Sequence, residues 1–181
     1  MRSGNGARPN WLITLAGIQA GIVGALILLA YLAVDSVWHR RSIWTVPNLL
    51  ASTFYGETAF RPGFGARTSA GVALALFIYG VLGALFGLVI RDHGSRFRVM
   101  LLGLIFGAAW FFLSFDVLWP SVNRLVSIYS PDRAMLVGHV LYGGVLGRRF
   151  PAYLKSVREI DRPAAESPEV PPEGPSTDSR L

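Results

Sequence analysis

The stretch PDRAMLVGHVLYGGVLGRR (131–149) decides the fold, because it is an apolar, glycine-bearing helix with a histidine at its middle. At about 1.5 Å per residue it is just long enough to cross a hydrocarbon core of about 30 Å. Helical periodicity puts on one face Met135, His139, Tyr142, Gly143 and Leu146. Polar side chains and a glycine on one face favour contact with protein over lipid, so we expect this face to be buried.

The composition is that of a membrane protein. Of 181 residues, 52% are hydrophobic and only 15% are charged, which is too apolar for one soluble core of this size. The absence of cysteine excludes disulfides, thiolate metal sites and cysteine nucleophiles. The net charge of +6 comes from Lys and Arg beside apolar segments, which is typical of topology signals, so we expect no nucleic-acid partner.

Three further apolar runs precede this helix. Residues 11–34 carry no charge and exceed the apolar core of a signal peptide, which indicates an uncleaved signal anchor. Residues 68–90 end at Arg91, and residues 99–119 end at Pro120, which lacks the N–H needed to continue a helix. We therefore predict an all-α, integral membrane four-helix bundle. Because only RDHGSR (91–96) separates the second and third spans, we expect these two to be antiparallel neighbours.

The connecting segments also carry signals. The outer loop, 35–67, contains PNLLASTFY (47–55), which suits a short interfacial helix with Pro47 in its first turn. Ser130, Pro131 and Asp132 predict the start of the last span, with Ser130 as its N-cap. The N-tail, 1–10, is polar, and the C-terminal segment, 151–181, is rich in Pro, Glu and Ser from about Asp161, where we expect disorder.

Charge distribution predicts the orientation. Four spans put both ends of the chain on one side of the membrane, and that side holds eleven Lys and Arg residues against six in the other loops. By the positive-inside rule both ends are cytoplasmic. Trp38, Trp44 and Trp119 would then lie at the outer interface and Trp11 at the inner one.

Several short patterns occur twice. LAYLAVDSVW (29–38) and WFFLSFDVLW (110–119) both end in Asp-x-x-Trp; VPNL (46–49) and VNRL (122–125) follow them, and then YGVLG (79–83) and YGGVLG (142–147). These patterns suggest a parallel 2+2 repeat of helical hairpins about an axis along the membrane normal. In such a repeat Asp35 and Asp116 would be equivalent.

Glycines spaced by four residues occur in every span and mark helix-packing stripes, because small residues let helix backbones approach. These glycines are Gly17, Gly21, Gly83, Gly87, Gly103, Gly107, Gly143 and Gly147. Packing within one chain is the favoured interpretation, and a homo-oligomer seam is the alternative.

His139 lies near the predicted bilayer midplane, where three roles are open. It could relay protons, bind a haem or pigment, or make a structural hydrogen bond to Tyr79 of the second span. We favour the structural role, because intramembrane polar groups pair with one another. A bis-histidine haem would need a second histidine at the same depth, and His39 and His93 lie at opposite surfaces.

Asp116 lies near a predicted helix C-terminus, where the helix dipole disfavours an anion. Compensating cations on the same side are Arg124, Arg133, and the pair Arg40 and Arg41 beside Asp35. An ion-pair cluster that locks the outer loops is the favoured interpretation. The alternative is an ion or proton entry site above His139. The candidate intramembrane polar cluster is Asp35, Asp116, His139, Tyr142 and Tyr79.

WTVPNLLAS (44–52) and GHVLYGGVLG (138–147) resemble patterns of small, uncharacterised four-span proteins of the bacterial inner membrane. This resemblance implies a multi-pass protein of the cytoplasmic membrane and brings no catalytic residue. The chain also lacks P-loop, zinc-protease, nucleophile-elbow and dinucleotide motifs, so we expect no enzymatic activity and no cofactor. The leading hypothesis is an accessory or scaffold subunit in the lipid bilayer, as a homo-oligomer or in a larger membrane complex. A transporter using Asp35, Asp116 and His139 and a haem- or pigment-binding subunit are the alternatives.

Overall fold

The computed structural model describes residues 10–60, 63–91 and 95–160, and within these ranges the chain is helical without a strand. The predicted N-tail and the tail after Asp161 lie almost wholly outside them. Three segments are long and apolar enough to span a membrane, so the prediction of a helical membrane protein is confirmed. The elements, in order, are α1 (Asn10–Trp38), α2 (Thr45–Tyr55), η1 (Gly56–Phe60), α3 (Ala66–Ile90), α4 (Arg96–Leu113), η2 (Ser114–Leu118), α5 (Trp119–Val122), α6 (Arg124–Tyr129) and α7 (Asp132–Ile160).

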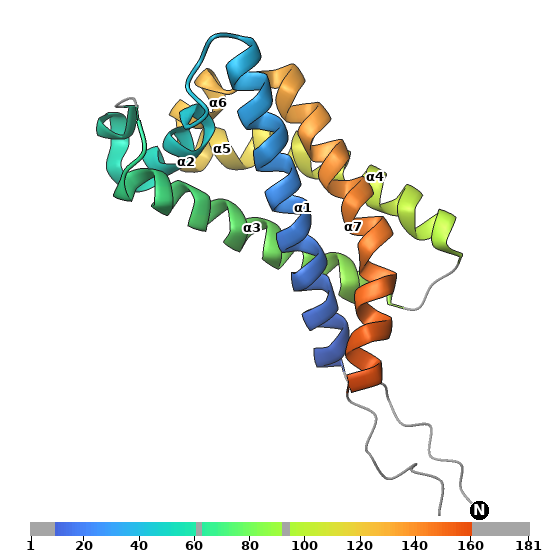
Figure 1. Ribbon diagram of the computed structural model, residues 1–181. Coiled ribbons are helices and arrows are strands. Elements are labelled where there is room, and N and C mark those ends of the chain that lie inside the picture. Colours follow the sequence, from blue (N-terminus) through green and yellow to red (C-terminus); the bar gives the residue numbers. More distant parts are fainter. Residues whose placement is uncertain (1–9, 61–62, 92–94, 161–181) are drawn as a thin grey trace, which may run out of the picture.

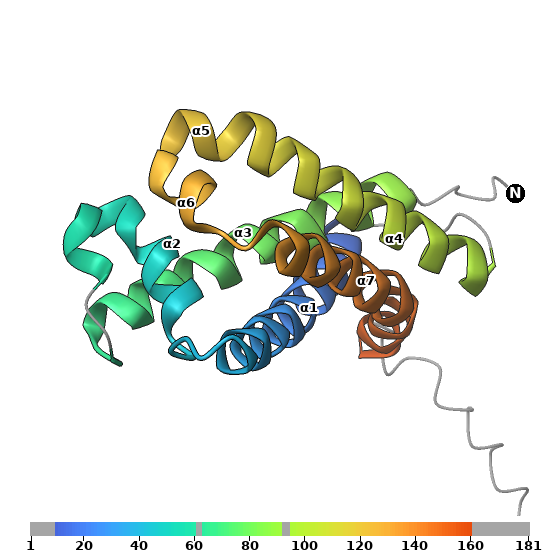
Figure 2. The same ribbon diagram turned by 90° about the horizontal axis from the view of Figure 1, so that it is seen from above.

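The long helices are arranged in the order α3, α1, α7, α4. The antiparallel helices α1 and α7 lie at the centre, α3 crosses α1, and α4 crosses α7 (Figures 1 and 2). In contrast, α3 and α4 share few contacts, although only a short connection joins them. The expectation that these two spans are neighbours is therefore wrong, because a short connection fixes only their ends and the glycine faces of both turn toward α1 and α7.

The crossing of α1 and α3 is made by backbone contact. A Cβ added to Gly17 would overlap the carbonyl oxygen of Gly83, and one added to Gly21 would overlap that of Tyr79. Only glycine leaves room for such an approach, so these stripes hold the two helices together through close dispersion contacts.

The crossing of α4 and α7 repeats this arrangement. A Cβ on Gly103 would overlap the carbonyl oxygen of Gly143, and a Cβ on Gly107 would overlap that of His139. A Cβ on Gly147 would lie 2.6 Å from the carbonyl oxygen of Val99. All eight predicted stripe glycines are buried within one chain, which confirms intrachain packing.

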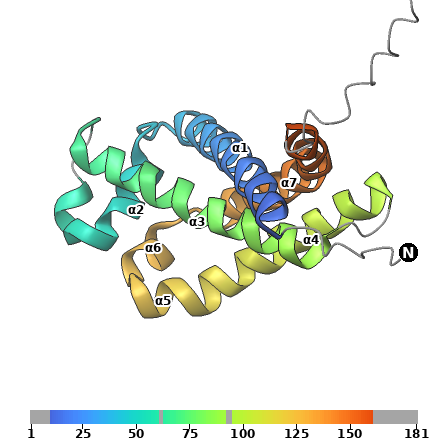
Figure 3. The same cartoon turned by 90° about the horizontal axis from the view of Figure 1, so that it is seen from below.

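The two crossings do not combine into the predicted repeat. A two-fold axis along the membrane normal would require α3 to pack on α4 as α1 packs on α7. Helices α1 and α7 lie side by side (Figure 3), whereas α3 and α4 share few contacts. The local contacts are thus alike because both pairs are antiparallel crossings of glycine stripes. The four helices as a set do not follow that axis.

Pro120 does not end its helix as expected. The helical path continues to Val122, because residues 114–118 form a wider π-helical turn in which Trp119 N–H bonds to the carbonyl oxygen of Ser114. The wider turn gives the proline ring the space that a regular α-helix denies it. The predicted end at residue 119 is therefore three residues too early.

The last helix is also longer than predicted. It passes through Pro151 and ends at Ile160, well beyond the predicted end at Arg149. Phe150, Leu154 and Val157 recur at helical spacing and are all buried, so this apolar face offsets the missing N–H of the proline. The arginines and the proline mark a change of surroundings and not the end of the helix.

Two expectations at the outer end are wrong. Ser130 is buried, but its hydroxyl has no hydrogen-bond partner and does not cap α7, which begins with Met135 N–H bonding to the carbonyl oxygen of Pro131 at 2.9 Å. Trp119 is buried beside Leu49 and Val126 and does not lie at the surface. The short helix α2, which was expected to lie at the membrane interface, packs on α3 and α6 and thereby covers Trp119.

Candidate functional site

A chain of hydrogen bonds joins α3 and α7 in the interior. The hydroxyl of Tyr79 lies 2.9 Å from His139 Nε2, and the hydroxyl of Tyr142 donates to the carbonyl oxygen of Tyr79 at 2.8 Å. The contact that the sequence favours between His139 and Tyr79 is thus present. The predicted buried face of the last span is confirmed, since Met135, His139, Tyr142 and Leu146 are all buried.

The geometry fixes the tautomer of His139. Its Nδ1 lies 2.7 Å from the carbonyl oxygen of Met135, which can only accept, so Nδ1 carries the proton. In the neutral ring Nε2 is then an acceptor and receives the Tyr79 O–H. Both ring nitrogens are occupied, and binding of iron or a pigment metal through Nε2 would require this hydrogen bond to break.

Aromatic rings enclose the histidine. Phe111 and Phe115 lie edge-on to it, with ring centroids 5.6 and 6.1 Å away, and Tyr79 lies at 5.8 Å on the other helix pair. The side chain of His139 is only 2% exposed. This arrangement supports a neutral, positioned imidazole.

A partly open cavity of about 30 Å³ lies between this hydrogen-bonded chain and the short helices α2, α5 and α6, which we call the outer cap after their predicted side. Tyr79 and His139 are at one wall, and the other walls are apolar or tryptophan side chains. The lining consists of Leu28, Leu29, Leu32, Val46, Leu50, Ala75, Ile78, Tyr79, Trp110, Phe115, Trp119, Val126, Met135 and His139. The volume has room for one or two water molecules, and neither Asp35 nor Asp116 borders it. The aqueous path that the transporter hypothesis requires is therefore not formed by these residues.

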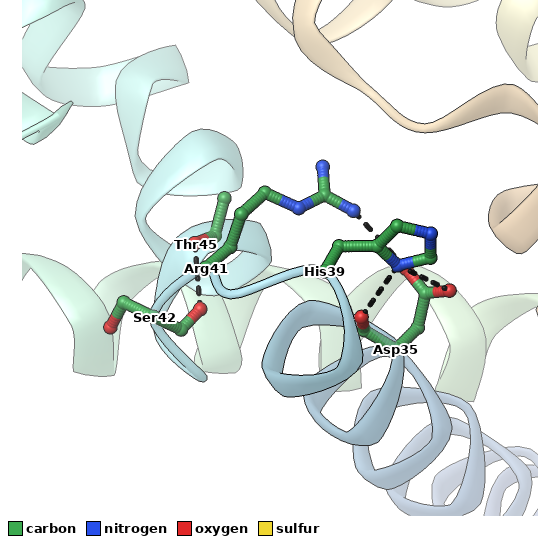
Figure 4. A network of polar contacts seen from close by, with 5 residues as sticks. All are labelled: Asp35, His39, Arg41, Ser42 and Thr45. Atoms are coloured by element: carbon green, nitrogen blue, oxygen red, sulfur yellow. Dashed lines mark hydrogen bonds and ion pairs between the residues drawn. The ribbon is translucent and has the colours of Figure 1, made fainter.

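Asp35 belongs to a separate cluster at the C-terminal end of α1. Its carboxylate lies 3.2 Å from Arg41 Nη2 and 3.4 Å from His39 Nδ1, and Figure 4 shows both side chains directed at it. Thr45 donates to the backbone carbonyl of Ser42 at 2.6 Å in the same turn. The contacts close the α1–α2 turn, so the expected loop-locking ion pair is present for Asp35.

Asp116 does not join that cluster. It is exposed on the π-helical turn η2, and no cation in the part of the chain that the structure describes lies within ion-pair distance. The expected pairing of Asp116 with Arg124, Arg133, Arg40 or Arg41 is therefore wrong. The reason is geometric: the buried face of the turn is that of Ser114, whereas Asp116 points away from the helix pair, beside the exposed Val117.

Two asparagines that the sequence did not single out as site residues hold the outer cap. Asn48 of α2 accepts from the hydroxyl of Thr68 at 2.7 Å, and Thr68 also accepts from Gly65 N–H at the start of α3. Asn123 donates to the hydroxyl of Ser52 at 2.8 Å and caps α6 by accepting from Leu125 N–H. The only sequence signal was their place in VPNL and VNRL.

Taken together, these groups hold helices in place. The deep polar atoms bond to one another, the outer ones close turns, and no group of three or more potential metal ligands occurs in the described ranges. Comparison with known proteins finds no match to a family model, to a curated protein or to a solved structure.

Proposed function

We propose that this chain is a non-enzymatic accessory or scaffold subunit of the bacterial inner membrane, with four crossings and both ends in the cytoplasm. The observation that carries the proposal is that the deep polar side chains are already hydrogen-bonded to the protein itself. Tyr79, His139 and Tyr142 satisfy one another, and the adjoining cavity is small and free of carboxylates. A transporter needs deep polar atoms that exchange partners, whereas a scaffold is stabilised by polar atoms that keep them.

The contacts of α7 support a fourth crossing. Gly138 faces Leu28 of α1, and Tyr142 faces Gly24 one turn further along, so the two helices run antiparallel over several turns. If α1 crosses the bilayer, its close partner crosses it too. The lower hydropathy of α7 fits its central place, since its small and polar residues face α1 and α4 and not lipid.

The positions of the cations support the orientation. With four crossings, the C-terminal ends of α3 and α7 and the N-terminal ends of α1 and α4 fall at one end of the bundle. The described cations near these helix ends are Arg91, Arg96, Arg98, Arg148, Arg149, Lys155 and Arg158. The opposite end has fewer: Arg40, Arg41, Arg67, Arg124 and Arg133. By the positive-inside rule the first end is cytoplasmic.

Association must use a surface other than the glycine stripes, because the chain's own helices fill these. The least covered helix is α4: only 22% of its most apolar segment is buried, against 50% for α1 and 44% for α3. Its exposed stripe carries Ile105, Phe112 and Leu113 and ends at the unpaired Asp116. A membrane helix that supplies a cation to Asp116 is the partner that fits, since an unpaired carboxylate beside lipid is costly.

Cross-linking tests the association, and the absence of native cysteine makes it direct. Ile105→Cys on α4 and Phe77→Cys on α3, both on exposed side chains, are compared in native membranes with a short thiol cross-linker. We expect a defined larger product from Ile105→Cys that Asp116→Asn weakens, and little from Phe77→Cys. Absence of any product from both variants, together with a monomer in mild detergent, would refute the scaffold proposal.

Thiol labelling tests the four crossings. Ser121 lies at the proposed outer end and Ser156 at the inner end, and both are exposed. A membrane-impermeant maleimide should label Ser121→Cys in intact cells and Ser156→Cys only after permeabilisation. Labelling of both from one side would disprove the proposed topology.

A further inference from the structure

Four arginines lie within three residues of the point where α4 crosses α7 near the proposed inner end. The crossing is so tight that a Cβ on Gly147 would lie 2.6 Å from the carbonyl oxygen of Val99 and 2.7 Å from the Cα of Met100. Arg148 and Arg149 follow that glycine on α7, and Arg96 and Arg98 precede that valine on α4. We call these four residues the inner arginine set.

The inner arginine set is exposed and lacks anionic partners. All four side chains are exposed, and none has an ion pair with another residue in the described ranges. The nearest acidic residue along α7, Glu159, pairs with Lys155 at 3.7 Å. Four like charges on two packed helices repel one another, so a bound anion would stabilise this arrangement.

The set also lies deeper than the ends of α1 and α7. Tyr142 is level with Gly24, and continuing the antiparallel register by seven residues places Arg149 level with Gly17. Gly17 is six residues, or about 9 Å, inside Trp11, where the apolar run of α1 begins. Arginines at this depth extend their side chains toward lipid phosphates and not into bulk water.

We infer that the inner arginine set binds headgroups of anionic phospholipids of the cytoplasmic leaflet. The guanidinium groups match phosphate oxygens in bidentate geometry, and the neighbouring surfaces of α4 and α7 offer apolar side chains such as Leu101 and Leu141 to the acyl chains. The inference rests on the proposed fourth crossing, because only then does the set lie at the depth of the headgroups.

Lipid titration of the purified full chain tests this site. Native mass spectrometry in neutral detergent compares phosphatidylglycerol with phosphatidylcholine, and inorganic phosphate is titrated in a separate arm. Each basic residue near an anionic surface contributes roughly fivefold in affinity, so Arg148→Gln/Arg149→Gln should lower the preference for phosphatidylglycerol roughly 25-fold. Arg96→Gln/Arg98→Gln on α4 should lower it similarly, which also tests the site if the first variant does not fold.

Arg133→Gln is the matched control, because Arg133 is an exposed cation at the other end of the same helix and has no ion pair within the part of the chain that the structure describes. It should keep the full preference. Equal loss in Arg133→Gln and Arg148→Gln/Arg149→Gln, no loss in either inner variant, or equally tight binding of inorganic phosphate alone would overturn the inference. These results concern the isolated chain, so they leave the cross-linking test of the scaffold proposal unaffected. Failure of the proposed topology would instead appear in the labelling of Ser121→Cys and Ser156→Cys.

Discussion

The crossing of α4 and α7 makes a quantitative prediction, because two adjacent glycines of α7 differ only in what a methyl group would meet. A Cβ on Gly143 would overlap the carbonyl oxygen of Gly103 and lie 2.9 Å from its carbon, both backbone atoms. A Cβ on Gly144 would meet only the Cδ2 of Leu104, at 3.2 Å, which is the end of a flexible side chain. Gly143→Ala must push two helices apart, and Gly144→Ala need not.

The magnitude follows from this geometry. Separating the backbones by about 0.5–1 Å forfeits a quarter to a half of the dispersion energy at the crossing, and overpacking of this kind costs about 1–3 kcal/mol. The helix-propensity gain of up to about 1 kcal/mol is the same for both alanines and cancels in the comparison. We therefore expect Gly143→Ala to be about 1–3 kcal/mol less stable than Gly144→Ala.

Reversible unfolding of the full chain in mixed micelles, followed by circular dichroism, measures this difference. Equal stability of the two variants would refute the assignment of the glycine stripe to the intrachain crossing. A loss of stability in Gly144→Ala alone would show that α7 contacts α4 through the face of Gly144 and not through that of Gly143.

Three further predictions concern single side chains. Tyr79→Phe leaves His139 Nε2 without a donor and should lower the free energy of unfolding by about 0.6–1.7 kcal/mol in the same assay. Tyr153→Phe removes a hydroxyl that has no hydrogen bond to any described residue, and it should have little effect. Asn123→Ala removes the hydrogen bond to Ser52 and the cap of α6, so it should lower the free energy of unfolding by about 1–3 kcal/mol and speed limited proteolysis of the outer cap. An unchanged rate of proteolysis would show that these hydrogen bonds do not hold the outer cap. Arg40 has a φ of 56°, so Arg40→Gly should raise the midpoint of thermal unfolding through relief of about 1 kcal/mol of strain, and a lower midpoint would show that its side chain matters more than its backbone.

The sequence predicted the contacts of residue types that are rare within the apolar runs. Few polar groups lie within the apolar runs, so the pairing of His139 with Tyr79 was the natural choice, and the buried face of the last span followed from periodicity. The glycine stripes were equally visible. Their partners were not, because a glycine spacing marks a close approach without naming the helix that approaches.

The errors arose where local signals meet tertiary geometry. Pro120 predicts a helix end, but the π-helical turn before it leaves room for the proline ring, so the helix continues. Pro151 lies within a helix because burial of Phe150 and Leu154 offsets its missing hydrogen bond. Asp116 was expected to pair because cations are numerous on its side, but charge proximity in sequence does not set the direction of a side chain. The hydrogen bonds of Asn48 and Asn123 join segments that are distant in the sequence, and no local sequence pattern predicts such bonds.

The distribution of polar atoms bears on the choice between a transporter and a scaffold. In an alternating-access cycle, deep polar groups trade contacts with water and substrate, so at least one of them must have a weak or replaceable partner. Here the imidazole and both phenols are enclosed by one another and by aromatic rings. Asp116 and the inner arginine set lie on the outside of the helices without an ion pair to the described residues, and the buried hydroxyl of Ser130, which also lacks a partner there, lies just before α7. Asp116 and the inner arginine set can therefore gain free energy by binding neighbours in the membrane, whereas the interior side chains already have partners and would gain little from a solute. This difference favours the scaffold proposal. If the chain is a scaffold, the double variant Tyr79→Phe/His139→Leu, which replaces the interior pair by apolar side chains, should still give the cross-linked product of Ile105→Cys. Loss of that product in a double variant that folds would contradict the scaffold proposal and assign a functional role to Tyr79 and His139.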